Sequence, residues 1–90
     1  MAKAVTSPKT GAELRRKVLD EYHLESAASL VLVDTAAAAL DQALAAEKVI
    51  ERQGLTVKTT RGVVAHPAVG IAQAARHRMI RALRALNLEV

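Results

Sequence analysis

Asp34 and Asp41 are the residues whose spacing comes nearest to acid–base chemistry. They lie seven positions apart, which places both carboxylates on one face of a helix. Two carboxylates on one face could serve as a general acid and a general base. Solvated helix charges are far more common than such pairs, so we expect no catalysis there.

Other reactive side chains lack the patterns that chemistry requires. The histidines have no metal-ligand spacing, and the chain contains no cysteine to complete a metal site. The serines lie in no nucleophile-elbow sequence, and the glycines are too scattered to form a phosphate-binding loop. The sequence therefore predicts no catalytic residue, no metal, no cofactor and no enzyme activity.

Basic residues are concentrated toward the C-terminus. The net charge is +4, yet residues 1–51 carry more acidic than basic side chains, and Glu89 is the one acidic residue after Arg52. A basic surface favours an acidic partner, with nucleic acid first. Because Tyr22 is the single aromatic residue, base stacking on single strands is disfavoured, whereas Lys and Arg can contact a duplex backbone.

Eight basic residues are candidates for that contact, and the alternative for each is a solvated helix charge. They are Lys3, Lys9, Arg15, Arg16, Lys17, Arg78, Arg81 and Arg84.

Two helices are expected in the first half, after a flexible basic arm at residues 1–9. The sequence "TGAE" predicts a capping box in which Thr10 and Glu13 open a helix from Gly11 to Tyr22. A long helix follows over residues 26–52. Its apolar seam repeats at steps of three and four: Leu30, Val33, Ala37, Leu40 and Leu44.

Glu47 occupies the next position of this seam. Either the seam ends there, which is the more frequent situation, or Glu47 makes a charged contact between subunits. Gly54 is expected to end the helix, since glycine tolerates a left-handed backbone.

A third helix is expected from Pro67 to Leu86, capped by His66. His77, Arg81 and Arg84 share one face of it. Arg76 falls in the apolar half, where a guanidinium should find a carboxylate or carbonyl partner.

Between the second and third helices, residues 55–65 predict a β-hairpin. The strands are Leu55–Val57 and Val63–Val64, joined by "KTTRG". An isolated hairpin is marginal in water, so this one should pack against a helix or another chain. The fold class is thus mainly α: three helices, one of them long, with a short hairpin, in one domain over residues 10–88 followed by a tail at 89–90.

Composition favours assembly of several copies. Alanine is abundant while Phe, Trp and Cys are absent, so the core is thin and disulfides cannot reinforce it. No signal peptide or uninterrupted apolar span is apparent, so we expect a cytosolic protein.

The order of these signals resembles the phage terminase small subunit family, in the branch typical of long-tailed phages. The resemblance extends from Gly11 to Leu88 through "GAELRRKVLDEYHL", "EKVIERQGLTVKTTRGVVAHPAV" and "LRALNLEV". It is most specific in "GLTV…RG…HPAV", where helix end, hairpin and next helix start follow in order.

This resemblance implies a non-catalytic adaptor in the cytoplasm of the infected or prophage-carrying bacterial host. Such subunits form rings, hold the viral genome near its packaging start, and bring double-stranded DNA to a large subunit that carries the ATPase and nuclease. By position, the resemblance implies that the hairpin and its flanks belong to the ring interface. We add Arg76, which needs a partner. The expected interface residues are Leu55, Val57, Val63, Val64, His66, Pro67 and Arg76.

Two other functions are compatible with the residues. One is a helical transcription regulator, which would discriminate its operator from random DNA by several kcal/mol. A helix-turn-helix requires a tight turn between its helices, and "HLES" is the only short link here. The other is a structural assembly protein that binds no DNA.

Overall fold

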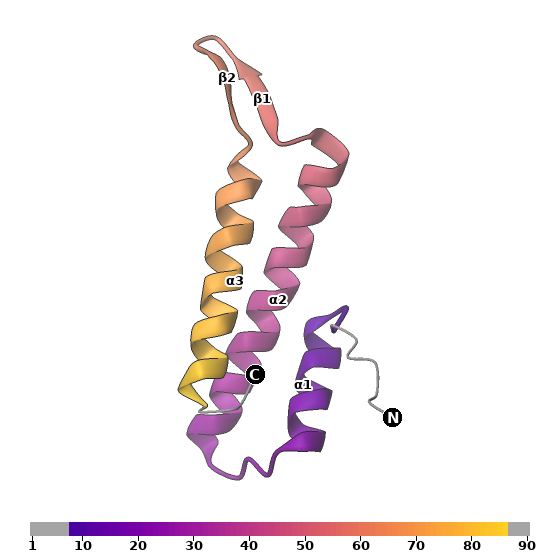
Figure 1. Ribbon diagram of the computed structural model, residues 1–90, viewed down its shortest axis with the longest axis vertical. Coiled ribbons are helices and arrows are strands. Elements are labelled where there is room, and N and C mark those ends of the chain that lie inside the picture. The colour runs from indigo at the N-terminus through magenta and orange to yellow at the C-terminus, as the bar shows by residue number, and fades with distance from the viewer. Residues whose placement is uncertain (1–7, 87–90) are drawn as a thin grey trace, which may run out of the picture.

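The computed structural model of the protein describes residues 8–86 and contains three helices and one hairpin (Figure 1). The elements are α1 (Gly11–Glu21), α2 (Ala27–Gln53), β1 (Thr56–Thr59), β2 (Gly62–Ala65) and α3 (Pro67–Ala85). This order confirms the mainly helical fold with a hairpin between the second and third helices. Each helix boundary lies within one residue of its expected position.

The helix ends are fixed by side chains that satisfy unpaired backbone donors. Thr10 Oγ1 accepts a hydrogen bond from the Glu13 amide at 3.1 Å, and Ser26 Oγ accepts one from the Ser29 amide at 3.1 Å. The predicted capping box is only half correct. The Glu13 carboxylate reaches past Thr10 and accepts from the Lys9 amide at 3.3 Å.

α2 and α3 pack side by side along the molecule, whereas the shorter α1 covers only part of α2 (Figure 1). The main core cluster comprises Leu14, Val18, Val33, Ala36, Leu40 and Ala82. A second cluster of Ala46, Ala68 and Ala72 lies nearer the hairpin. Alanine supplies most of the buried apolar residues, so the helices approach closely but bury little area per residue. This confirms the prediction of a thin core.

One glycine permits the close approach of α1 to α2. A Cβ atom on Gly11 would lie 2.2 Å from the Ala37 carbonyl oxygen and 2.6 Å from a carboxylate oxygen of Asp41. No side chain fits at those distances. The Gly11 amide instead donates a hydrogen bond to Asp41 Oδ1 at 2.8 Å, which joins the first turn of α1 to the middle of α2.

The strands of the hairpin are longer than predicted, and the turn between them is shorter. β1 and β2 pair antiparallel from Thr56 opposite Ala65 to Thr59 opposite Gly62, so the predicted loop "KTTRG" shrinks to a two-residue turn. Threonine is β-branched and favours the extended backbone, which is consistent with Thr59 continuing β1 up to the turn. Gly62 has φ 115° immediately after the turn, a conformation that favours glycine.

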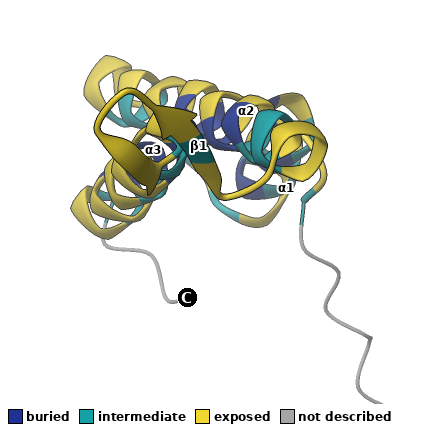
Figure 2. Ribbon diagram, turned by 90° about the horizontal axis from the view of Figure 1, so that it is seen from above, coloured by how far each residue is buried: buried dark blue, intermediate teal, exposed yellow. Residues whose placement is uncertain are grey.

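The molecule is elongated and thin, with extents of 53 × 34 × 18 Å. Viewed from above, the buried residues lie between the helices, and almost all of the hairpin is exposed (Figure 2). We expected the hairpin to pack against a helix or another chain; among its strand residues only Val57 is half-buried within this chain.

Candidate functional site

The two spaced aspartates hold α1 against α2. Arg15 Nε donates to Asp34 Oδ1 at 2.8 Å, and Asp41 accepts from the Gly11 amide. Each carboxylate therefore has a partner on α1, and the two carboxylates do not converge on a common site. By length and composition α2 could cross a membrane, but its aspartates bind a neighbouring helix, as expected in a packed bundle rather than in lipid.

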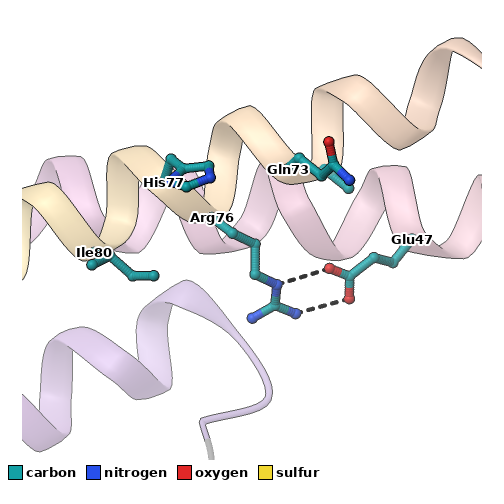
Figure 3. Close-up of a pocket in the computed structure, with 6 residues that line it drawn as sticks. Glu47, Gln73, Arg76, His77 and Ile80 are labelled. Carbon is teal, nitrogen blue, oxygen red and sulfur yellow. Dashed lines mark hydrogen bonds and ion pairs between the residues drawn. The ribbon is translucent and has the colours of Figure 1, made fainter.

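Glu47 and Arg76 form an ion pair between α2 and α3 (Figure 3). Arg76 Nε donates to Glu47 Oε2 at 2.9 Å, and Arg76 Nη2 donates to Glu47 Oε1 at 2.8 Å. This two-pronged geometry confirms that Arg76 needed a carboxylate partner. The partner lies in the same chain, at the seam position where the sequence allowed either an ending or a contact between subunits.

The ion pair changes the titration of both groups. Hydrogen bonding from Arg76 holds the pKa of Glu47 below its usual value, and the same contact raises the pKa of Arg76. Both side chains are 41% exposed, so the pair is screened by water and contributes modestly to stability.

The pair lines an open pocket of about 330 Å³ together with Ala72, Gln73, His77 and Ile80. Ile80 is 41% exposed although the helical period places it in the apolar half of α3, because that half is wider than the surface α2 covers. No serine, threonine, cysteine or lysine lines this pocket, and within residues 8–86 no group of three or more metal-ligand side chains occurs.

Two of the three basic residues of α1 pair with carboxylates. Arg15 pairs with Asp34, and Lys17 Nζ lies 3.3 Å from Glu13 Oε1. Hydrogen bonds from the Lys9 amide and from Lys17 lower the pKa of Glu13, which keeps this carboxylate charged. Arg16 and Lys9 are exposed, while Lys3 lies outside the described residues.

The basic residues of α3 are in a different electrostatic environment. Arg78, Arg81 and Arg84 are exposed, and α3 contains no acidic residue. Arg78 donates a hydrogen bond to the neutral Gln42 side chain, and in the described part of the chain Arg81 and Arg84 form no ion pair. We call these three residues the arginine face; its positive charge is not neutralised within the fold.

The two faces of the hairpin differ in character. Val57 lies opposite Val64, so the two side chains share one face, and Leu55 continues it through the hydrogen bond from the His66 amide to the Leu55 carbonyl at 2.8 Å. We call Leu55, Val57 and Val64 the apolar hairpin face. Leu55 is 66% and Val64 44% exposed. Val63 lies opposite Lys58 and therefore on the other face.

His66 connects the hairpin to both long helices. Its Nδ1 accepts a hydrogen bond from the Ala68 amide at 3.0 Å, and its Nε2 lies 2.7 Å from Gln53 Oε1. Because Nδ1 is an acceptor, the ring proton resides on Nε2, and Nε2 donates a hydrogen bond to Gln53 Oε1. His66 thus caps α3 as expected, and Pro67 forms the first residue of that helix.

Sequence reasoning missed two features of this surface. Lys58 and Arg61 are exposed at the end of the hairpin, but the hairpin was assigned to assembly alone. Gln42 was not connected to Arg78, since 36 residues separate them. The sequence did contain a signal for Lys58 and Arg61, because no acidic residue that could neutralise them occurs between Arg52 and Leu86.

Comparison with known proteins relates the chain to a protein family. No curated protein and no solved structure matches the chain. The family model described as phage terminase, small subunit, matches residues 15–89. That region includes most of α1, all of α2, the hairpin and α3, in the order that the sequence resemblance required, and the family supports a role in phage DNA packaging. The chain belongs to the phage terminase small subunit family.

Proposed function

We propose that this protein is a non-catalytic adaptor for phage DNA packaging. Identical copies assemble into a ring, bind double-stranded DNA, and regulate the large terminase subunit that carries the ATPase and nuclease, in the cytoplasm of the bacterial host. The observation that carries DNA binding is the arginine face of α3, where exposed guanidinium groups have no carboxylate partner within the fold.

The arginine face suits the sugar–phosphate backbone of a duplex. Arg81 and Arg84 lie three positions apart on one side of α3, about 5 Å along the axis, and Arg78 extends the charge by about one further turn. Guanidinium groups bind phosphate oxygens through paired donors. With no aromatic side chain on this surface, binding should follow phosphate charge rather than base stacking.

Assembly into a ring is supported by the apolar hairpin face and the thin core. Leu55 and Val64 are exposed on a hairpin that extends past the ends of the helices (Figure 1). A two-stranded hairpin is marginal in water without a partner, and a second copy would cover this face. Mass measurement in solution tests the ring: a closed oligomer supports it, and a stable monomer would refute it.

The fold argues against the regulator alternative. α2 and α3 lie side by side along their length and are separated by a hairpin, whereas a helix-turn-helix joins two crossing helices through a short turn. A regulator would also select one operator sequence. We expect this protein to bind unrelated duplexes with similar affinity.

Charge reversal on the arginine face tests the DNA-binding part of the proposal. Arg81→Glu with Arg84→Glu should weaken binding to a short labelled duplex and flatten its salt dependence, because fewer counterions are released. Lys48→Glu with Arg52→Glu makes the same charge change on α2, beside the acidic Glu47 and Glu51, and should have a smaller effect. Equal effects of the two double variants would remove the arginine face from the site.

A further inference from the structure

The end of the hairpin carries positive charge that the fold leaves uncompensated. Lys58 and Thr59 are the last two residues of β1, and Arg61 is the second residue of the turn that follows. Both side chains are exposed and form no ion pair within residues 8–86. No acidic residue occurs from Arg52 to Leu86, so nothing in the hairpin or α3 neutralises this charge. We call residues 58–61 the hairpin tip.

The backbone of the hairpin tip is well fixed. Thr59 Oγ1 accepts a hydrogen bond from the Arg61 amide at 3.2 Å and donates one to the Gly62 carbonyl at 2.9 Å. At the opposite end of the hairpin, His66 bridges Gln53 of α2 and the first turn of α3. The hairpin is therefore attached to both helices at its base and closed by side-chain hydrogen bonds at its tip. The backbone positions from which Lys58 and Arg61 extend are therefore defined.

The tip and the arginine face lie at opposite ends of the long axis (Figure 1). α3 has 19 residues and β2 has four, which correspond to about 28 Å and about 13 Å. The separation of Arg61 from Arg81 and Arg84 is thus comparable with one turn of B-DNA, about 34 Å. A two-stranded β-ribbon is also narrow enough to enter the major groove of a duplex.

From these observations we infer that the hairpin tip is a second contact for double-stranded DNA, in which Lys58 and Arg61 bind backbone phosphates. The inference rests on the proposed function, since it assumes that the protein binds DNA. It assigns the hairpin two separate roles: the apolar hairpin face meets another copy of the chain, and the charged tip meets the nucleic acid.

The salt dependence of DNA binding tests this inference. Lys58→Ala with Arg61→Ala should weaken binding to a short labelled duplex. The plot of log K against log salt should become flatter, because its slope loses about 0.9 in magnitude for each lost phosphate contact. The charge-preserving variant Lys58→Arg with Arg61→Lys should retain the wild-type slope. Lys48→Ala with Arg52→Ala, which removes two cations from α2, serves as the matched control and should change the slope less.

The outcomes separate this inference from the proposed function. If the wild type binds DNA and the tip variant keeps the full slope, the tip is not a contact and only the inference fails. If the wild type binds no duplex even at low salt, the proposed function fails with it. A reduced slope that accompanies a loss of oligomer mass in the tip variant would assign the effect to assembly, and would also overturn the inference.

Discussion

At the scale of single residues, the carboxylates that were considered for chemistry make structural contacts between helices. Asp34 and Asp41 have the spacing of a carboxylate pair, yet one binds Arg15 and the other binds the Gly11 amide. Glu47, which follows the apolar seam, binds Arg76. By sequence, these three carboxylates were candidates for catalysis or for contacts between subunits. In the structure they hold the helices of one chain together.

Gly11 is the residue at which a single added carbon should be most harmful. Gly11→Ala places a Cβ 2.2 Å from the Ala37 carbonyl oxygen, so α1 must shift away from α2 and weaken the Asp41 contact. We expect a loss of about 1–3 kcal/mol in the free energy of unfolding, as in other overpacked sites. Urea unfolding followed by circular dichroism measures it.

Gly70→Ala is the matched control for this substitution. Gly70 lies within α3, and a Cβ there would meet nothing within 4 Å. Because alanine favours the helix over glycine, this variant should gain up to about 1 kcal/mol. A Gly11→Ala protein as stable as the wild type would show that α1 does not approach α2 as closely as described.

The Glu47–Arg76 pair should make stability depend on pH. Arg76 lowers the pKa of Glu47 from its ordinary value of 4.5, so the folded state binds this proton less readily than the unfolded chain. The stabilisation is therefore complete above about pH 4.5 and is lost as the pH falls through the lower folded pKa. Since both side chains are 41% exposed, we expect at most about 1 kcal/mol.

Glu47→Gln tests this dependence. Its deficit in unfolding free energy relative to the wild type should be largest near neutral pH and should shrink in acid. Glu51→Gln on the same helix removes an exposed carboxylate with no ion pair in the described structure, and should show little deficit at any pH. A deficit for Glu47→Gln that is constant with pH would contradict the electrostatic explanation.

At the scale of elements, the hairpin contributes no residue to the core clusters, unlike the three described helices. Its strands are four residues each and almost entirely exposed. It is attached at its base through the His66–Gln53 hydrogen bond, and side-chain alternation separates Val57 and Val64 from Lys58 and Val63. The element thus carries an apolar face and a charged tip that are separate from each other.

A charge on the apolar hairpin face should impair assembly without unfolding the helices. Val64→Asp places a carboxylate among Leu55 and Val57, which would be costly to bury against another copy. We expect a lower mass in solution by light scattering, with unchanged helical circular dichroism. Thr56→Asp introduces the same charge on the opposite face and should leave the mass unchanged; an equal loss of mass in both variants would argue against a face-specific contact.

At the scale of the whole molecule, charge and apolar surface are separated along the chain. The carboxylates on the described helices all lie on α1 and α2, where Arg15 and Lys17 form ion pairs, whereas the hairpin and α3 contain no acidic residue. A body 18 Å thick with a largely alanine core has little interior from which to draw stability. Both features suit a subunit that functions as part of a larger assembly on DNA.

The sequence alone determined the elements of this protein. Helical periodicity, the caps at Thr10 and His66, and the glycine at position 54 are local signals, because each acts within a turn or two of its own backbone. The same locality allowed the family to be identified from the order of short motifs. It also placed Arg76 correctly as a residue that required a partner.

Only the tertiary structure decided which residues meet. The pairs Arg15–Asp34, Gly11–Asp41, Glu47–Arg76 and Gln42–Arg78 join residues 19 to 36 positions apart. Such contacts depend on how the helices pack, and helix periodicity does not specify the neighbour that a face will meet. Packing paired Arg15 with Asp34 and Arg76 with Glu47. It left Arg81 and Arg84 without an ion pair in the described residues, and the positions of Lys and Arg in the sequence could not reveal which cations would find a partner.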